Sequence, residues 1–190
     1  MPDSEKIENI RVRLGTFDNA WFVPGNPWLR LIWYVVQVLT IQTSLPLGSV
    51  GIFILRSFGA KIGAGVVLKP RVRIKYPWNL SVGNDVWIGE DVWIDNLASV
   101  SIGSDVCISQ GAYLFCGNHD YSSSSFDLIV GTIVLEDGAW VGAKGVVCPG
   151  VTCGTHSVLA AGSVATKNLD AYSIYQGNPA TRIRVRNITK

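Results

Sequence analysis

A chain of 190 residues that is 48% hydrophobic and 16% charged is long enough to bury a core of its own, so we expect one domain. Its formal net charge of +2, without a basic stripe interleaved with aromatic residues, argues against a nucleic-acid-binding protein. The four cysteines form no CxxC pair and lie within apolar repeats, which favours free thiols in a reducing, cytoplasmic setting over disulfides.

Residues 1–61 precede the regular part of the sequence. Their start, MPDSEKIENIRVRLGTF, mixes both signs of charge and lacks the form of a signal peptide. An apolar stretch at residues 28–59 follows, but Pro46 and Gly48 divide it, and neither half reaches the roughly 18–20 residues of a membrane span. We expect apolar helices that cap the fold. The alternative is a peripheral contact with the inner membrane, since Trp28, Arg30, Trp33 and Tyr34 suit a headgroup boundary.

From residue 62 to residue 170 the sequence repeats every six residues. Thirteen of fifteen hexads open on Ile, Leu or Val, which makes chance patterning in an ordinary all-β domain a poor alternative. A helix of period 3.6 cannot hold a strict period of six. The opening residues, in groups of three, are Ile62, Leu68 and Ile74; Val82, Ile88 and Ile94; Ile102, Ile108 and Leu114; Leu135, Val141 and Val147; Cys153, Leu159 and Ala165.

The breaks in this repeat fall only between groups of three hexads. The step is eight from Ile74 to Val82 and from Ile94 to Ile102, and twenty-one from Leu114 to Leu135. A triangular coil explains this pattern, because each hexad then forms one short parallel strand and a corner, and insertions leave at a single corner. The sequence therefore predicts an all-β parallel β-helix of about five coils over residues 62–170, followed by a C-terminal tail at 171–190.

The longest break carries one of the two histidines of the chain. By the six-residue count, the third coil spans residues 102–119, and a Ser-rich loop at 120–134 leaves from it directly after His119. A loop of this length in a compact domain is usually functional or disordered. A neutral imidazole on a rigid edge is suited to act as a general base, with Asp120 or a backbone carbonyl orienting its other nitrogen. The alternative is a structural corner histidine, which is our interpretation of His156.

These motifs resemble those of the hexapeptide-repeat acyltransferases, whose fold is a left-handed parallel β-helix. The segments CISQGAYLFCGNHDY, WVGAKGVVCPGVTCG, LAAGSVATKNL and GNPATRIRVR are most similar to sugar O-acetyltransferases, closest to those assigned to colanic acid biosynthesis, over nearly the whole chain. The resemblance implies a homotrimer that transfers acetyl groups from acetyl-CoA directly to a sugar hydroxyl, with His119 as the base. It implies no metal, since two histidines cannot supply a three-histidine site.

The resemblance also implies where the two substrates bind. The pantetheine arm of acetyl-CoA would meet backbone amides, and its phosphates would meet a hydroxyl and two basic groups. These residues are Ala143, Ala161, Gly162 and Ser163, followed by Thr166, Lys167 and Arg184. For Lys167 and Arg184 plain solvation is the alternative. Trp140 packs either at a subunit interface or near pantetheine.

On the acceptor side, the resemblance points to Asp95 and Asn96 as contacts of the sugar, and Trp93 could stack on a pyranose face. A buried structural turn is the alternative for Asp95 and Asn96. The leading hypothesis is therefore an O-acetyltransferase for a sugar of an exopolysaccharide precursor, which could be lipid-linked. The alternatives are acetyl transfer to a small acceptor such as a free sugar, serine or an antibiotic, and a non-catalytic β-helix scaffold.

Overall fold

The hexads form short parallel strands in a computed structural model, which describes residues 11–189. The strands of the five coils are β1 (Lys61–Ile62), β2 (Val67–Leu68) and β3 (Arg73–Ile74); β4 (Leu80–Val82), β5 (Trp87–Ile88) and β6 (Trp93–Asp95); β7 (Val100–Ile102), β8 (Cys107–Ile108) and β9 (Tyr113–Phe115); β12 (Ile133–Leu135), β13 (Trp140–Val141) and β14 (Val146–Val147); β15 (Thr152–Cys153), β16 (Val158–Leu159) and β17 (Val164–Ala165).

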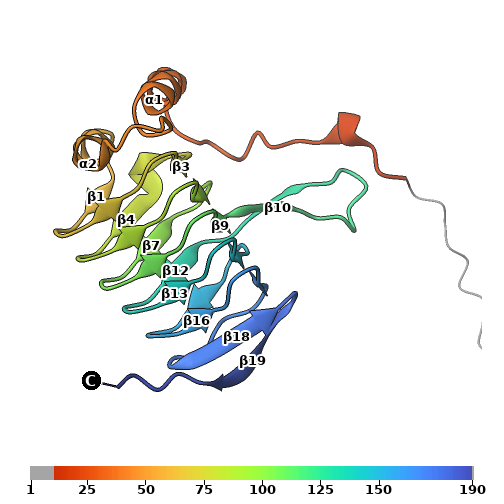
Figure 1. Cartoon of the computed structure of the whole chain (residues 1–190). Helices are drawn as coiled ribbons and strands as arrows, with labels where there is room; N and C mark the ends of the chain where they lie inside the picture. The colour runs from red at the N-terminus through yellow and green to blue at the C-terminus, as the bar shows by residue number, and fades with distance from the viewer. Residues whose placement is uncertain (1–10, 190) are drawn as a thin grey trace, which may run out of the picture. The chain divides into compact units, whose positions relative to one another are not determined.

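Equivalent strands of successive coils pair in parallel and make three faces (Figure 1). Face A contains β1, β4, β7, β12 and β15; face B contains β2, β5, β8, β13 and β16; face C contains β3, β6, β9, β14 and β17. The opening residues of the hexads stack on one another, for example Ile62 on Val82 and Val82 on Ile102. All of them except the half-buried Ile62 are buried, so they form the core of the prism.

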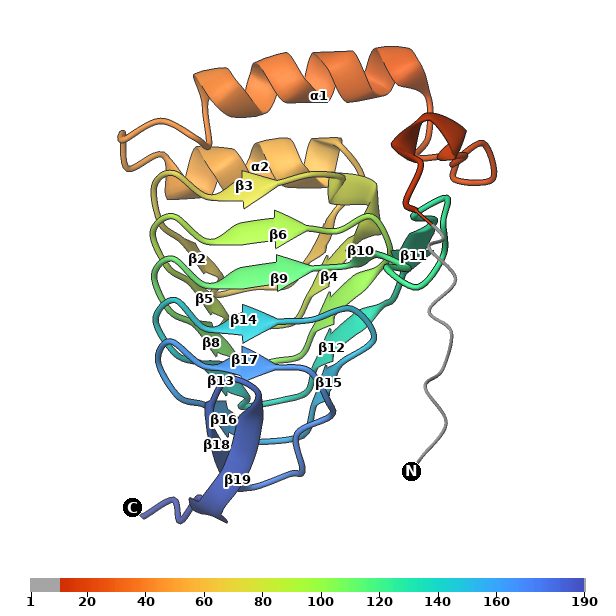
Figure 2. The ribbon, with the colours of Figure 1, turned by 90° about the vertical axis from the view of Figure 1, so that its right-hand side faces the viewer.

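Figure 2 shows the hand of the coil. The strands of face C lie on the side that faces the viewer and run from left to right, and each successive coil lies below the one before it. This combination makes the β-helix left-handed. The predicted fold class is therefore confirmed. The structure adds a partial sixth coil, because Leu169 forms a bridge to Cys153 and β18 (Ser173–Gly177) pairs with β16 on face B. The region described above as a tail contains β18 and β19 (Ala180–Val185), an antiparallel pair that extends face B.

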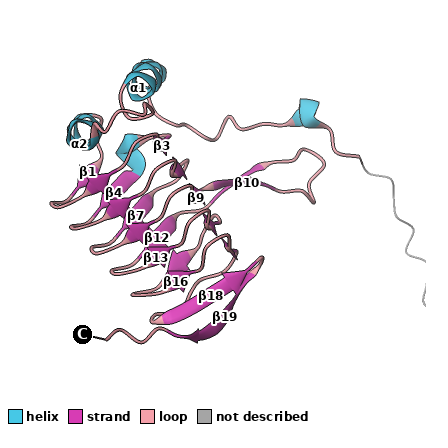
Figure 3. Ribbon diagram, in the orientation of Figure 1, coloured by secondary structure: helices cyan, strands magenta, loops and turns pink. Residues whose placement is uncertain are grey.

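Helices lie across the end of the prism where β1 begins (Figure 3). They are α1 (Pro27–Leu39) and α2 (Gly48–Ser57); shorter 3-10 turns are η1 (Leu14–Thr16) and η2 (Pro77–Asn79). The start of helix α1 is stabilised by a side-chain cap, since the Asn26 side chain accepts from the Trp28 N–H at 2.8 Å and Pro27 occupies the first helical position. None of the helices in residues 11–189 combines the length and hydropathy needed to cross a membrane.

The described residues form two compact units. The coil unit contains residues 24–117 and 130–189; the hairpin unit contains residues 11–23 and 118–129. Strands β10 (Gly117–His119) and β11 (Leu128–Val130) pair with each other and not with any coil strand. The Gly131 N–H donates to the Cys116 carbonyl at 2.8 Å and closes the third coil at Cys116. His119 therefore lies in a hairpin strand, and the excursion begins at residue 117, before the predicted 120.

Candidate active site

His119 lies in the hairpin unit between two aromatic rings. Its imidazole stacks on Phe126 with ring centroids 4.4 Å apart and an interplanar angle of 8°, and the Phe17 ring lies 5.5 Å away. His119 Nδ1 is 2.8 Å from the Phe126 carbonyl oxygen. A carbonyl can only accept, so Nδ1 carries the hydrogen of the neutral ring and Nε2 keeps its lone pair. The imidazole is thus oriented to accept a proton at Nε2.

The rest of the hairpin is held by serine and aspartate side chains. The Asp120 carboxylate accepts from the Ser122 N–H and Oγ, and these hydrogen bonds hold the pKa of Asp120 below its usual range. Ser123 Oγ donates to Asp127 at 3.0 Å, and the Asp120 N–H donates to the Asp127 carbonyl. Asp120 is therefore engaged within the loop, and the Phe126 carbonyl is the group that orients His119.

Phe126 has an unusual backbone conformation that serves this contact. Its φ is +55°, in the left-handed region that a residue with a side chain rarely adopts. The N-terminal segment supports the same loop, since the Arg13 N–H donates to the Ser124 carbonyl at 2.7 Å. The sequence alone did not predict Phe126 or Phe17 as neighbours of His119, because neither carries a polar side chain that would mark such a role.

A groove of about 670 Å³ follows the corner between faces B and C of the coil unit. Three of the residues expected to bind acetyl-CoA line it, namely Ala143, Ala161 and Arg184. The corner also brings Ser109, Gln110 and Trp140 into the groove. A narrower groove of about 370 Å³ shares Ser109 and Gln110 and continues along the earlier coils.

The floor of this groove is backbone. Within residues 11–189, the N–H groups of Ala143 and Ala161 donate to no protein acceptor, so they remain available to a ligand. A Cβ at Gly142 would lie 2.6 Å from the Ala161 nitrogen, which explains the glycine. Trp140 forms a wall, fixed by a 2.9 Å hydrogen bond from its Nε1 to Ser109 Oγ. An extended chain with amide groups, such as pantetheine, fits a corridor of this kind.

Other residues expected at the acetyl-CoA site lie elsewhere in the chain. Ser163 is buried, and its Oγ accepts from the Gly177 N–H at 3.0 Å, which ties the corner to β18. Gly162 is exposed beside Ala161, with a φ of +68°. Thr166 and Lys167 are exposed on the corner between faces C and A, away from the groove. Within one chain the structure thus brings together three of the seven residues.

Of the residues expected on the acceptor side, Asp95 is largely buried and paired. Its Oδ1 lies 2.8 Å from Lys75 Nζ, and its side chain is 14% exposed. Burial, together with the neighbouring Asp95 carboxylate, raises the pKa of Tyr113 to about 12. A carboxylate neutralised by a lysine can still accept a hydrogen bond from a sugar hydroxyl, so the geometry is compatible with the expected role.

Asn96 has a structural function. It is fully buried, its Oδ1 accepts from the Tyr76 N–H at 2.9 Å, and its Nδ2 donates to the Tyr76 carbonyl at 2.6 Å. Both ends of the amide therefore bind the backbone of Tyr76, at the end of the preceding coil. This arrangement favours the structural alternative that the sequence left open for Asn96.

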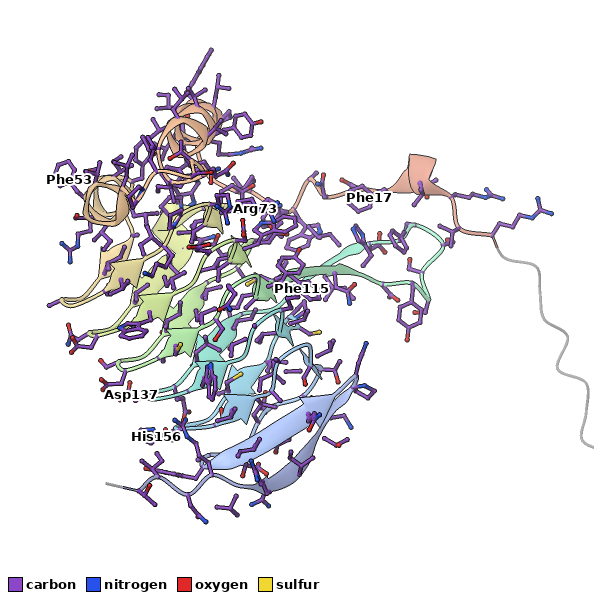
Figure 4. The ribbon with its side chains drawn as sticks, in the orientation of Figure 1. Phe17, Phe53, Arg73, Phe115, Asp137 and His156 are labelled. Carbon is purple, nitrogen blue, oxygen red and sulfur yellow. The ribbon has the colours of Figure 1, made fainter. Side chains whose placement is uncertain are left out.

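Trp93 belongs to a ladder on face C that leaves little of its ring for a sugar. The Arg73 guanidinium lies 4.4 Å from the Trp93 ring centroid, and Tyr113, from the next coil, stacks on the ring at 4.6 Å. Phe115 continues the ladder from Tyr113 at 5.0 Å; Figure 4 shows Arg73 and Phe115 along this edge, with Asp137 and His156 on the opposite one. With both faces covered, stacking of a pyranose on Trp93 is disfavoured.

In the described part of the chain, no three His, Cys, Asp or Glu side chains lie close enough to hold a metal ion. His156 has a corner conformation, with a φ of +55°, and its ring packs on Tyr172 at 4.9 Å. This packing agrees with a structural role for His156.

Comparisons with known proteins agree with the repeat and the fold. The family model described as "Hexapeptide repeat of succinyl-transferase" matches residues 79–116 and 132–167. WcaF of Escherichia coli strain K12, assigned as a colanic acid biosynthesis acetyltransferase, is 40% identical over 166 residues, which cover 87% of this chain and 91% of WcaF. Galactoside O-acetyltransferase of the same strain is 26% identical over 137 residues, covering 70% of this chain and 68% of that protein.

A solved structure shares the fold over most of the chain. A hexapeptide-repeat-containing acetyltransferase from Vibrio cholerae O1 biovar eltor, solved with acetyl coenzyme A, superposes with a TM-score of 0.76 at 22% identity; the match covers 85% of this chain and 88% of that one. The coil and its repeat define a hexapeptide-repeat protein. The identity to WcaF adds that the chain belongs to the hexapeptide-repeat acetyltransferase family that contains WcaF, which confirms the expected resemblance and an enzyme.

Proposed function

We propose that this protein is an acetyl-CoA-dependent O-acetyltransferase that acetylates a sugar hydroxyl of an exopolysaccharide precursor, with His119 as the general base. The observation that carries the proposal is the His119 ring, whose Nδ1 is bound to the Phe126 carbonyl so that Nε2 is free to accept a proton. The similarity to WcaF and to galactoside O-acetyltransferase supports a sugar as the acceptor.

The proposed reaction is a direct transfer. His119 Nε2 takes the proton of the acceptor hydroxyl as the oxygen attacks the thioester carbonyl of acetyl-CoA. A backbone N–H stabilises the tetrahedral oxyanion, which collapses to the acetyl ester as the C–S bond breaks. The imidazolium then returns its proton to the CoA thiolate, so the products are the O-acetylated sugar and CoA.

The donor site in this proposal is the corner groove. The free N–H groups of Ala143 and Ala161 would bind the amide carbonyls of pantetheine, and Arg184 would contact a phosphate. Gly162, Ser163, Thr166 and Lys167 stay proposals for the same ligand, as do Asp95, Asn96 and Trp93 for the acceptor. Among these, Asp95 is the one whose contacts fit best.

We also propose a homotrimer. In a single chain, face B exposes large apolar side chains to water, since Trp87 is 63% and Trp140 44% exposed. Lateral packing of copies along such a face would bury them. A cytoplasmic location and a lipid-linked acceptor at the inner membrane belong to the same proposal.

The test is CoA release measured with a thiol reagent on a panel of acceptors. The panel contains nucleotide sugars, oligosaccharides, free sugars, serine and an antibiotic, so that it distinguishes an acceptor of polysaccharide synthesis from a small acceptor. We expect His119→Ala to lower kcat by about 10²- to 10⁴-fold with little change in the KM for acetyl-CoA. His156→Asn is the matched control, because asparagine tolerates the positive φ of this corner.

Two results would contradict the proposal. Full activity in His119→Ala would show that His119 is not the general base, although the protein would still be an acetyltransferase. A wild-type protein that neither binds acetyl-CoA nor turns over any acceptor would remove the enzyme itself.

A further inference from the structure

Helix α1 presents an apolar surface to solvent. Its sequence, PWLRLIWYVVQVL, has only two side chains that are charged or carry an amide, Arg30 and Gln37. A helix on the surface of a globular protein normally turns its polar side outward. Here the large hydrophobic residues more than a third exposed are Trp28, Leu29, Leu31, Ile32, Tyr34, Val35, Val38 and Leu39.

The rotation of α1 is fixed by contacts with the first coil. Trp33 is 1% exposed and donates from Nε1 to the Ile74 carbonyl at 2.8 Å, and its ring packs on Phe58 at 5.1 Å. The buried Gln37 accepts from the Ile74 N–H at 3.4 Å. Because these bonds hold the amide inward, the helix cannot turn its apolar side into the core.

The exposed apolar area extends beyond α1. Phe53 of α2 is 70% exposed and points away from the coils in Figure 4, and Leu45 and Val50 are also exposed. Figures 1 and 2 show both helices side by side over the end of the prism. We call the exposed apolar residues of α1 and α2, with Leu45, the cap surface.

Charge is segregated toward the same end of the prism. Residues 19–84 contain seven basic residues and no aspartate or glutamate, whereas all fourteen acidic residues lie outside this range. Arg71 and Lys75 pair with acids of the second coil. Within the described residues, Arg30, Lys61 and Lys69 form no ion pair, so their charge is available to an outside anion.

We propose that the cap surface docks on a lipid bilayer that contains anionic headgroups. The aliphatic side chains would enter the boundary of the acyl region, Trp28 and Tyr34 would lie at the headgroup level, and Arg30 would meet lipid phosphate. A second copy of the chain fits less well, because its equivalent end carries the same excess of positive charge. An α1 of 13 residues lies along the interface in this arrangement and does not cross it.

The experiment is co-sedimentation of the full chain with vesicles of phosphatidylcholine, with and without phosphatidylglycerol, at low and high ionic strength. We expect binding that requires phosphatidylglycerol and weakens with salt. Ile32→Ser should weaken the vesicle affinity roughly tenfold by removing inserted apolar area. Arg30→Glu should weaken it roughly 25-fold, at about fivefold for each of the two units of charge.

Each variant has a matched control on β19. Ile183, 50% exposed against 53% for Ile32, becomes Ser, and the exposed Arg182 becomes Glu, so composition and net charge change equally. We expect both controls to stay within about twofold of wild type. Thermal melting and CoA release without vesicles verify folding and keep this proposal separate from the enzymatic one.

Three outcomes would overturn the proposal. The first is no binding to phosphatidylglycerol vesicles at low ionic strength. The second is an equal loss of binding in the β19 controls. The third is a lower molar mass of Ile32→Ser than of wild type by light scattering, which would make the cap surface a contact between copies.

Discussion

At the scale of the residue, Asn96 links two coils through one buried amide. Its side chain accepts from the Tyr76 N–H, which would otherwise be buried without a partner, and donates to the Tyr76 carbonyl, which also accepts from the Asn79 N–H. An unsatisfied buried backbone group costs about 1–3 kcal/mol, so an amide here is worth more than its two hydrogen bonds alone. This cost explains an asparagine at this corner.

We predict that Asn96→Ala lowers the free energy of unfolding by about 2–4 kcal/mol, measured by denaturant titration. Asn79→Ala is the control, because Asn79 Nδ2 reaches two carbonyls only at 3.3 Å; its loss should be within about 1 kcal/mol. Unchanged stability of Asn96→Ala with a raised KM for the sugar would instead support Asn96 as an acceptor contact.

At the scale of the element, the β10–β11 hairpin positions His119, the general base of the proposed mechanism. The carbonyl that orients His119 comes from Phe126, seven residues further on, and the left-handed turn at Phe126 aims it. The stacked Phe126 ring excludes water from one side of the imidazole. The hairpin therefore sets both the tautomer and the direction of the His119 ring.

This arrangement predicts that neutral His119 is protonated at Nδ1, with an unprotonated Nε2. The chain has two histidines, so ¹⁵N-histidine labelling gives two imidazoles, and the His156→Asn variant assigns the remaining signals to His119. A long-range ¹H–¹⁵N correlation spectrum should show the strongly deshielded nitrogen at Nε2. The opposite tautomer at neutral pH would contradict the Phe126 hydrogen bond.

The hexads were readable from the sequence because each strand repeats the same burial. Every opening residue from Leu68 onward is buried. Because the coils stack in the same way, equivalent positions need the same kind of residue, and the sequence therefore repeats with the period of the strands. Contacts made once have no period to reveal them. The Phe126 carbonyl, the closure of the third coil at Cys116 and the outward apolar side of α1 all depend on single tertiary contacts, which explains why they were missed or left open.

At the scale of the whole molecule, the core contains cysteine thiols, and folding opposes the ionisation of these thiols. Burial raises the pKa of Cys116 to about 11 and that of Cys153 to about 12, above the ordinary value of 9.0. The unfolded chain loses these protons at lower pH than the folded chain does. The contribution of the thiols to stability is therefore complete below pH 9 and is lost as the pH rises through the folded values.

We therefore predict that the melting temperature falls between pH 9 and pH 12 and that Cys153→Val, which keeps an apolar residue at this core position, shows a shallower fall. The expected slope is at most about 1.4 kcal/mol per pH unit for each thiol. Calorimetry across this range measures it. Equal slopes in the variant and in wild type would show that other groups govern alkaline unfolding.

The closure between Cys116 and Gly131 has an evolutionary consequence. Two residues joined by a 2.8 Å hydrogen bond form a junction at which the intervening chain can be lengthened, shortened or exchanged without disturbing the register of the coils above and below. Under the proposed function, exchange of residues 117–130 for the matching segment of a relative changes the acceptor side while the coils proposed to bind acetyl-CoA stay constant. A grafted hairpin from a relative would be the natural unit for engineering a new acceptor.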